Sequence, residues 1–197
     1  MRKIMTTYVL HGGMTSKDSL DNDLFFRQFT SLVNKASVKV MMCYWARDRK
    51  QWEELLRRDQ KKIQLHSAKT VHLSIAEDPK DLFHRIAKYD VLYVAGGDAE
   101  RIEPLYPELS RLKHYLENKV YIGSSMGAFL ASASYVLSLD TQDETSVHSG
   151  VGLLPVKILC HWDKETRKQM KLDLLRKKDP ESPIVPLDEC KFVTMYT

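Results

Sequence analysis

The segment best suited to chemistry is Gly123-Ser-Ser-Met-Gly127, a G-x-S-x-G pattern centred on Ser125. A strand-like apolar run precedes it and a helical run at residues 128–133 follows it. This order predicts a nucleophile elbow, in which a strand turns sharply into a helix and flanking glycines leave room for the turn. Ser125 would stand exposed beside the free N–H groups of a helix N-terminus, which favour an oxyanion. A plain strand-to-helix connection can carry the same pattern.

A serine hydroxyl becomes a good nucleophile only when a base takes its proton and a third group orients that base. Asp140 and His161 both follow strand-like runs, in the chain order Ser, Asp, His. We therefore predict Ser125 as nucleophile, His161 as general base and acid, and Asp140 as the residue that orients His161. The structural alternative is that Asp140 begins a turn and His161 is a hydrogen-bonded histidine near the core.

Gly96-Gly97-Asp98 follows another strand-like run and opens a helix. Loops at the carboxyl ends of neighbouring parallel strands meet at one edge, so a backbone N–H group of this loop could bind an oxyanion together with the N–H of Met126. A tight turn with Asp98 as helix N-cap is a compatible alternative. No glycine pair completes a nucleotide-binding motif, and no His, Cys or Asp cluster has metal-ligand spacing. We therefore expect no cofactor and no metal.

Short β-branched runs alternate with amphipathic stretches over the first 134 residues, and this alternation predicts the elements that position these side chains. It is typical of an α/β three-layer sandwich with a mostly parallel central sheet, helices on both faces and the elbow after a central strand. The expected strands are residues 7–11, 38–44, 70–75, 91–95 and 119–122, and the expected helices are 24–33, 51–65, 79–87 and 109–116.

The C-terminal part shows a charged helical stretch at about 164–177 and two apolar runs, 184–187 and 191–195. These two runs predict a short C-terminal hairpin that turns at Asp188-Glu189-Cys190. Acidic residues interrupt the basic stretches 47–62 and 164–178, which we interpret as solvated helix faces rather than binding patches. With no repeat and no long linker, residues 1–197 are expected to form a single domain.

The composition excludes several other classes of protein. The chain of 197 residues is 43% hydrophobic and 28% charged, as in ordinary globular proteins. Its net charge of +4 is scattered along the chain, which argues against nucleic-acid binding. The three cysteines are odd in number and form no C-x-x-C pair, which favours a reducing compartment. The N-terminus lacks the pattern of a leader, and no run of about 20 apolar residues is present, so we expect a cytoplasmic location away from the membrane. A monomer or a homodimer is expected.

These residues resemble the peptidase E family, the aspartyl dipeptidases, whose fold is related to that of the class I glutamine amidotransferases. The resemblance implies the roles given above for Ser125, His161 and Asp140, and implies Gly97 and Met126 as oxyanion donors. It also implies that Arg167 recognises the acidic first residue of the substrate. It is carried by Val94-Ala-Gly-Gly-Asp98, Tyr121-Ile-Gly-Ser-Ser-Met-Gly-Ala128, Asp140, Gly152-Leu-Leu-Pro155, His161 and Glu165-Thr-Arg167.

The resemblance implies a serine peptidase whose partner is a small peptide, a dipeptide with N-terminal aspartate, hydrolysed through an acyl-enzyme. The chain departs from the family pattern at Asp98, Met126 and Phe129, and Asp98 would bring a negative charge to the substrate-binding region. Two alternatives therefore stay open. One is another serine amide or ester hydrolase on the same scaffold, and the other is a non-catalytic member that binds an acidic peptide or metabolite.

Overall fold

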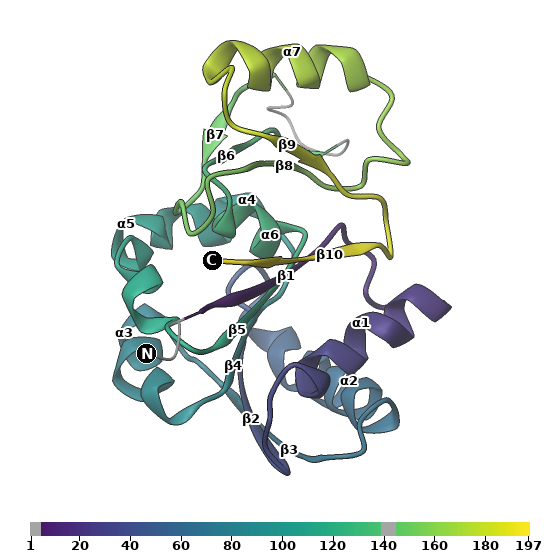
Figure 1. Cartoon of the computed structure of the whole chain (residues 1–197), viewed down its shortest axis with the longest axis vertical. Coiled ribbons are helices and arrows are strands. Elements are labelled where there is room, and N and C mark those ends of the chain that lie inside the picture. Colours follow the sequence, from purple (N-terminus) through teal and green to yellow (C-terminus); the bar gives the residue numbers. More distant parts are fainter. Residues whose placement is uncertain (1–4, 139–144) are drawn as a thin grey trace.

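The computed structural model describes residues 5–138 and 145–197 and is built around a six-stranded sheet (Figure 1). Its strands run in the order β10-β1-β5-β4-β2-β3. Neighbouring strands are parallel except β10, which is antiparallel to β1. The prediction of a mostly parallel sheet is therefore confirmed. The strands are β1 (Thr7–His11), β2 (Ser37–Cys43), β3 (Thr70–Ile75), β4 (Val91–Val94), β5 (Val120–Ser124) and β10 (Phe192–Tyr196).

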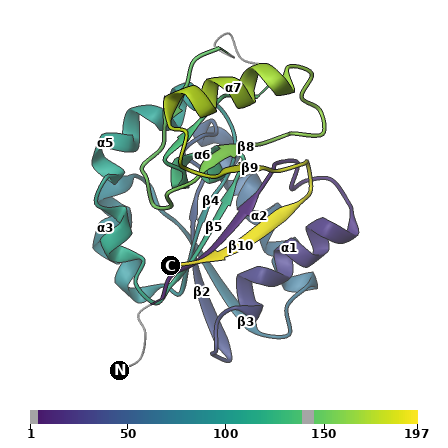
Figure 2. The same ribbon diagram turned by 45° about the horizontal axis from the view of Figure 1, so that its top comes forward.

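Helices cover both faces of this sheet, as predicted for a three-layer sandwich. The chain steps from β1 to β2 to β3 in one direction and then returns through β4 to β5. Right-handed crossovers must therefore place α1 and α2 on one face and α3 to α5 on the other, which is the arrangement seen in Figures 1 and 2. The helices are α1 (Leu20–Ser31), α2 (Trp52–Leu65), α3 (Pro79–Arg85), α4 (Ala99–Ile102) and α5 (Tyr106–Leu109).

The same reversal of direction marks the position at the carboxyl edge of the sheet where a binding site is expected. The connection that leaves β2 runs to one face, whereas the connection that leaves the adjacent β4 runs to the other. In open α/β sheets, ligands bind at the carboxyl ends of the strands next to such a switch. The loops that follow β1, β2, β4 and β5 all lie at this edge.

A second, four-stranded sheet in the order β7-β6-β8-β9 lies beyond that edge, with α7 (Lys168–Lys178) packed on it (Figure 1). The prediction of a C-terminal hairpin is wrong, because β9 and β10 belong to different sheets. β9 pairs in parallel with β8, whereas β10 pairs with β1 of the central sheet and so satisfies backbone groups that would otherwise be exposed at a sheet edge. The strands are β6 (Ser134–Tyr135), β7 (His148–Ser149), β8 (Lys157–Leu159) and β9 (Ile184–Pro186).

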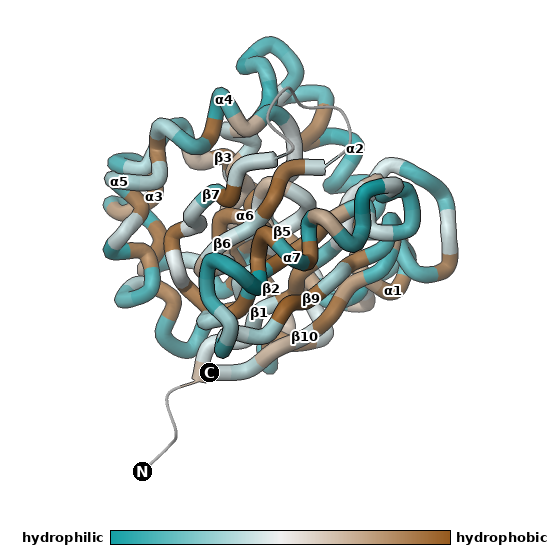
Figure 3. The backbone as a smooth tube through the Cα atoms, turned by 90° about the horizontal axis from the view of Figure 1, so that it is seen from above, coloured by the Kyte–Doolittle hydropathy of each residue, from teal (hydrophilic) through white to brown (hydrophobic). Residues whose placement is uncertain are grey.

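One continuous cluster of buried side chains joins the two sheets. It extends from Phe29 and Tyr93 beside the central sheet to Ile158 of β8 and Leu187 beyond β9. Figure 3 shows hydrophobic segments gathered in the middle of the molecule and hydrophilic segments at its periphery. Each helix in the described ranges is too short or too polar to cross a membrane.

Candidate active site

Ser125 lies at a sharp turn between β5 and α6 (Met126–Ala131), as the elbow pattern predicts. Its backbone has φ 50° and ψ −109°, a strained conformation for a residue with a Cβ. The flanking glycines permit the turn, because a Cβ on Gly123 would collide with Gly127 and a Cβ on Gly127 would collide with Val94. The Ser125 N–H donates to the His11 carbonyl at 2.9 Å, which fixes the turn against β1.

The Ser125 hydroxyl meets His161 across the carboxyl edge of the sheet. Its Oγ lies 3.2 Å from His161 Nε2. His161 also has a positive φ of 53°, and its N–H donates to the Gly12 carbonyl at 3.0 Å. The ring is held close to the first loop, because a Cβ on Gly13 would lie 2.5 Å from Nε2. The structure thus brings the predicted nucleophile and the predicted base into contact.

Glu189 supplies the carboxylate on the other side of the imidazole, a contact that the sequence analysis missed. His161 Nδ1 lies 2.9 Å from Glu189 Oε1. A carboxylate only accepts, so Nδ1 carries the hydrogen of the neutral ring and Nε2 is left to accept from Ser125. Asp140, the residue predicted for this role, lies outside the described residues. In the described part of the chain, the carboxylate that contacts the His161 ring is therefore that of Glu189.

Two backbone N–H groups tie the Glu189 segment to the loop after β1 and to the segment after His161. The Cys190 N–H donates to the Gly13 carbonyl at 2.9 Å, and the Glu189 N–H donates to Asp163 Oδ1 at 2.8 Å. Burial alone would raise the pKa of Asp163, but the Glu189 N–H and Lys164 hold it below its ordinary value. The carboxylate, the imidazole and the first loop therefore form one connected unit.

Cys160 Sγ lies 3.8 Å from the Ser125 carbonyl oxygen, yet this thiol is no competing nucleophile. It is buried, and burial raises its pKa well above the ordinary value. Cysteine reacts as the thiolate, so a thiol in such surroundings is inert.

His11 holds the loop that packs against His161. The Gly13 N–H donates to His11 Nδ1 at 3.0 Å, so the hydrogen of the neutral ring is on Nε2, which donates to Asn22 Oδ1 at 2.8 Å. The Asn22 amide then donates to the carbonyls of Met14 and Lys17. Burial lowers the pKa of His11 from its ordinary value to about 4. The network therefore requires a neutral histidine at this buried position.

This lowered pKa predicts a pH-dependent stability. Between pH 6.5 and 4 the unfolded chain binds a proton at residue 11 that the folded chain excludes, so stability falls as the pH drops through this window. The loss attributable to His11 is about 2 kcal/mol from pH 7 to pH 5. We expect His11→Gln to show a correspondingly smaller drop than wild type in urea unfolding at these two pH values.

The matched control is His72→Gln, which replaces an exposed histidine on β3. It should keep the pH dependence of the wild-type protein. Equal drops in stability for His11→Gln and wild type would show that His11 does not carry the effect.

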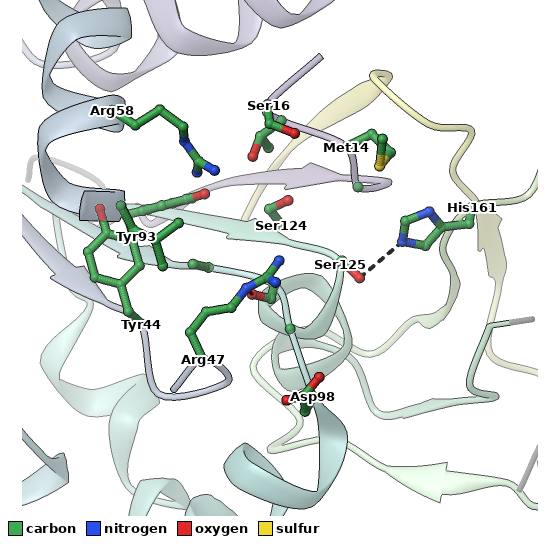
Figure 4. A pocket seen from close by; sticks show the side chains of 16 residues that line it. Met14, Ser16, Tyr44, Arg47, Arg58, Tyr93, Asp98, Ser124, Ser125 and His161 are labelled. Atoms are coloured by element: carbon green, nitrogen blue, oxygen red, sulfur yellow. Dashed lines mark hydrogen bonds between the residues drawn. The ribbon is translucent and has the colours of Figure 1, made fainter. Parts of the chain in front are cut away.

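A pocket of about 270 Å³ opens beside Ser125 and His161 (Figure 4). This volume is slightly below the roughly 300–1,000 Å³ of typical small-molecule sites, so it suits a small substrate. Gly97 and Asp98, two of the predicted site residues, line it, and Gly96 passes so close that a Cβ there would lie 2.8 Å from the Ser125 Cβ. The lining residues are Gly13, Met14, Thr15, Ser16, Tyr44, Arg47, Leu55, Arg58, Tyr93, Ala95, Gly96, Gly97, Asp98, Ser124, Ser125 and His161.

The remaining predicted residues lie apart from this pocket. The Met126 side chain is buried, and its backbone N–H is the first of α6, one of the N–H groups at a helix start that have no partner within the helix. Phe129 points into the core, where its ring stacks on Tyr135 at a centroid distance of 4.5 Å. Arg167 is exposed at the start of α7 and does not line the pocket. In the described ranges no group of three or more His, Cys, Asp or Glu side chains is arranged to hold a metal.

The site consists of a serine at the end of a parallel strand, a histidine hydrogen-bonded to it and a carboxylate that contacts the histidine. This arrangement on an α/β sheet defines the serine-hydrolase class. The model of peptidase family S51 matches residues 8–196, and the chain therefore belongs to this family of peptide-bond hydrolases. The resemblance predicted from the motifs is thus confirmed.

Two solved structures share the fold. A peptidase from an acI-B1 actinobacterium superimposes with a TM-score of 0.67 at 13% identity, covering 98% of this chain and 84% of that one. A candidate peptidase E protein from Listeria monocytogenes EGD-e gives a TM-score of 0.60 at 19% identity and covers 98% and 99% of the two chains. Among curated proteins no relative matches the chain.

Proposed function

We propose that this protein is a cytoplasmic serine peptidase that removes an N-terminal aspartate from short peptides, dipeptides above all, through an acyl-enzyme on Ser125. One observation carries the proposal: Ser125 Oγ lies 3.2 Å from His161 Nε2, while His161 Nδ1 lies 2.9 Å from Glu189. This chain of contacts is what an alcohol needs to lose its proton at the moment of attack. Membership of family S51 supports peptide-bond hydrolysis.

In the acylation step, Ser125 Oγ attacks the carbonyl carbon of the scissile peptide bond and its proton passes to His161 Nε2. The N–H groups of Gly97 and Met126 are the proposed donors to the resulting oxyanion, each worth roughly 3 to 4 kcal/mol of barrier. When the intermediate collapses, the C–N bond breaks and His161 gives its proton to the leaving amine. The product at this stage is an ester between Ser125 and the N-terminal residue.

In the deacylation step, water attacks the ester while His161 Nε2 takes its proton. Collapse of the second tetrahedral intermediate releases aspartate and returns the proton to Ser125. Glu189 takes no proton in either step. It orients the imidazole and stabilises its positive charge, which is the role that the carboxylate has in other serine triads. Asp98 lines the pocket with an exposed carboxylate that pairs with Arg101 at 3.0 Å, and this carboxylate is proposed to face the substrate's α-ammonium group as well.

A substrate panel combined with a labelling reagent tests the proposal against its alternatives. We expect release of free aspartate from Asp-Leu, little reaction with Leu-Asp and N-acetyl-Asp-Leu, and stoichiometric labelling of Ser125 by a small phosphonate ester. Faster turnover of a neutral amide or ester would instead favour another hydrolase on the same scaffold. Absence of both turnover and labelling would favour a non-catalytic binder of acidic peptides.

A further inference from the structure

Two arginines form a basic wall of the pocket. Arg47 lies in the loop after β2 and Arg58 lies on α2, and both line the pocket together with Ser125 and His161. In Figure 4 their guanidinium groups reach into the pocket from the side of Ser125 that faces away from His161. Arginine binds a carboxylate through a planar pair of donors, so two arginines at one wall favour an anionic group there.

The positive charge of Arg47 is not neutralised within the described part of the chain. Its Nε donates to the Gly96 carbonyl at 2.6 Å, which fixes the side chain beside the loop that passes Ser125. No described carboxylate lies within ion-pair distance of this guanidinium. The terminal amino groups of Arg47 are therefore positioned, and free, to donate to a bound anion.

Arg58 is held by a different partner. Its Nε and Nη2 donate to Asp59 Oδ1 at 2.9 and 2.7 Å, and Asp59 is fully buried. Tyr44 donates its hydroxyl to the other oxygen of Asp59 at 3.0 Å. The buried carboxylate thus uses one edge of the guanidinium and locks its orientation, which lowers the entropy cost of binding through the remaining nitrogen.

The position of the arginines relative to His161 tells which part of a peptide they face. His161 must protonate the leaving amine, so the leaving part of the substrate lies on the His161 side of Ser125. The acyl part, which contains the N-terminal residue, extends the other way. Arg47 and Arg58 lie on that side, whereas Arg167 is outside the pocket.

We propose that Arg47, assisted by Arg58, binds the side-chain carboxylate of the substrate's N-terminal residue and so determines the preference for an acidic acyl group. This inference rests on the proposed function and names the residues that give it its selectivity. It replaces Arg167 by Arg47 as the principal residue that recognises the acidic side chain.

The test compares an acidic ligand with its neutral isostere in two independent measurements. The first is kcat/KM for Asp-Leu and Asn-Leu, and the second is calorimetric binding of L-aspartate and L-asparagine to Ser125→Ala protein, which cannot turn over. Arg47→Gln should lower kcat/KM for Asp-Leu and affinity for aspartate by about 10- to 100-fold, the effect of losing a charge-assisted pair. It should leave Asn-Leu hydrolysis and asparagine binding within about twofold of the parent protein.

Arg57→Gln is the matched control. Arg57 is the neighbour of Arg58 on α2, but its side chain is exposed and does not line the pocket. It should change neither measurement. Arg58→Gln should reduce aspartate selectivity less than Arg47→Gln does. A loss of selectivity in Arg167→Gln with none in Arg47→Gln would overturn the proposal.

The two measurements also separate this inference from the proposed function. If aspartate binds through Arg47 but Asp-Leu is not cleaved, the hydrolytic function fails and the anion site stands. If Asp-Leu and Asn-Leu are cleaved equally well, the anion site fails and the hydrolytic function stands. Equal binding of aspartate and asparagine, or binding of neither, also overturns the anion site.

Discussion

Ser125→Ala protein is expected to hydrolyse an Asp-X dipeptide with kcat about 10⁶-fold below wild type. The variant keeps the pocket and the proposed oxyanion donors but has no atom that can form the acyl-enzyme. Its fold should be intact, because among the described residues the Ser125 hydroxyl bonds only to His161 and alanine can occupy the same elbow. We expect the free energy of unfolding to change by no more than about 1 kcal/mol. Release of free aspartate and urea unfolding measure the two effects.

Ser110→Ala is the matched control, because it removes a serine hydroxyl at a position that does not line the pocket. Ser110 is exposed after α5, and its hydroxyl donates to the Pro107 carbonyl at 2.8 Å. This control should keep wild-type kcat. Wild-type turnover by the Ser125→Ala protein would disprove the mechanism, because the hydroxyl that lies 3.2 Å from His161 Nε2 would then not be the nucleophile.

The central sheet could be predicted from the sequence because its signals are local. Residues 7–11 and 70–75 are short β-branched runs bounded by turn residues, and they coincide with β1 and β3. The elbow is equally local, since its glycines and serine fall within five consecutive positions. His161 could be proposed because it follows a strand and comes after the serine in the chain. Its contact with Ser125, across 36 positions of the chain, follows only from the folded structure.

The mistaken hairpin and the missed Glu189 have the same physical cause. Residues 184–187 and 191–195 look like two strands joined by a short turn, which is the local signature of a hairpin. Their actual partners, β8 and β1, are distant in the sequence, and the two strands belong to different sheets. The connecting segment therefore crosses the carboxyl edge of the central sheet and places Glu189 on His161. No local pattern of residues indicates that the segment between β9 and β10 passes from one sheet to the other.

The basic stretch 47–62 shows a similar limit of sequence patterns. Its interrupting acidic residues suggested a solvated face, and Arg57 is indeed exposed. Arg47 and Arg58 nevertheless line the pocket, because the loop after β2 and the helix α2 border the carboxyl edge of the sheet. The alternation of charges was visible in the sequence. Which charges face the pocket depends on how α2 packs against β3 and α1.

Glu189→Gln is expected to lower kcat for an Asp-X dipeptide by about 10³- to 10⁴-fold with little change in KM. The amide is nearly isosteric, but it carries no charge to stabilise the imidazolium. Its NH₂ group can also donate to His161 Nδ1, which would favour the tautomer that leaves a hydrogen on Nε2 and cannot accept the Ser125 proton. The loss should therefore appear in the acylation rate, measured by single-turnover kinetics and by phosphonate labelling of Ser125.

Two further variants decide between the candidate carboxylates. Asp188→Asn makes the same change at the exposed neighbouring position and should keep wild-type kcat. Asp140→Asn tests the residue predicted from chain order. If Glu189 orients His161, the loss in Glu189→Gln must exceed that in Asp140→Asn by orders of magnitude, because the single Nδ1 hydrogen is already donated to Glu189 at 2.9 Å. The reverse ranking would return the orienting role to Asp140, and Glu189 would then be a structural neighbour of the imidazole.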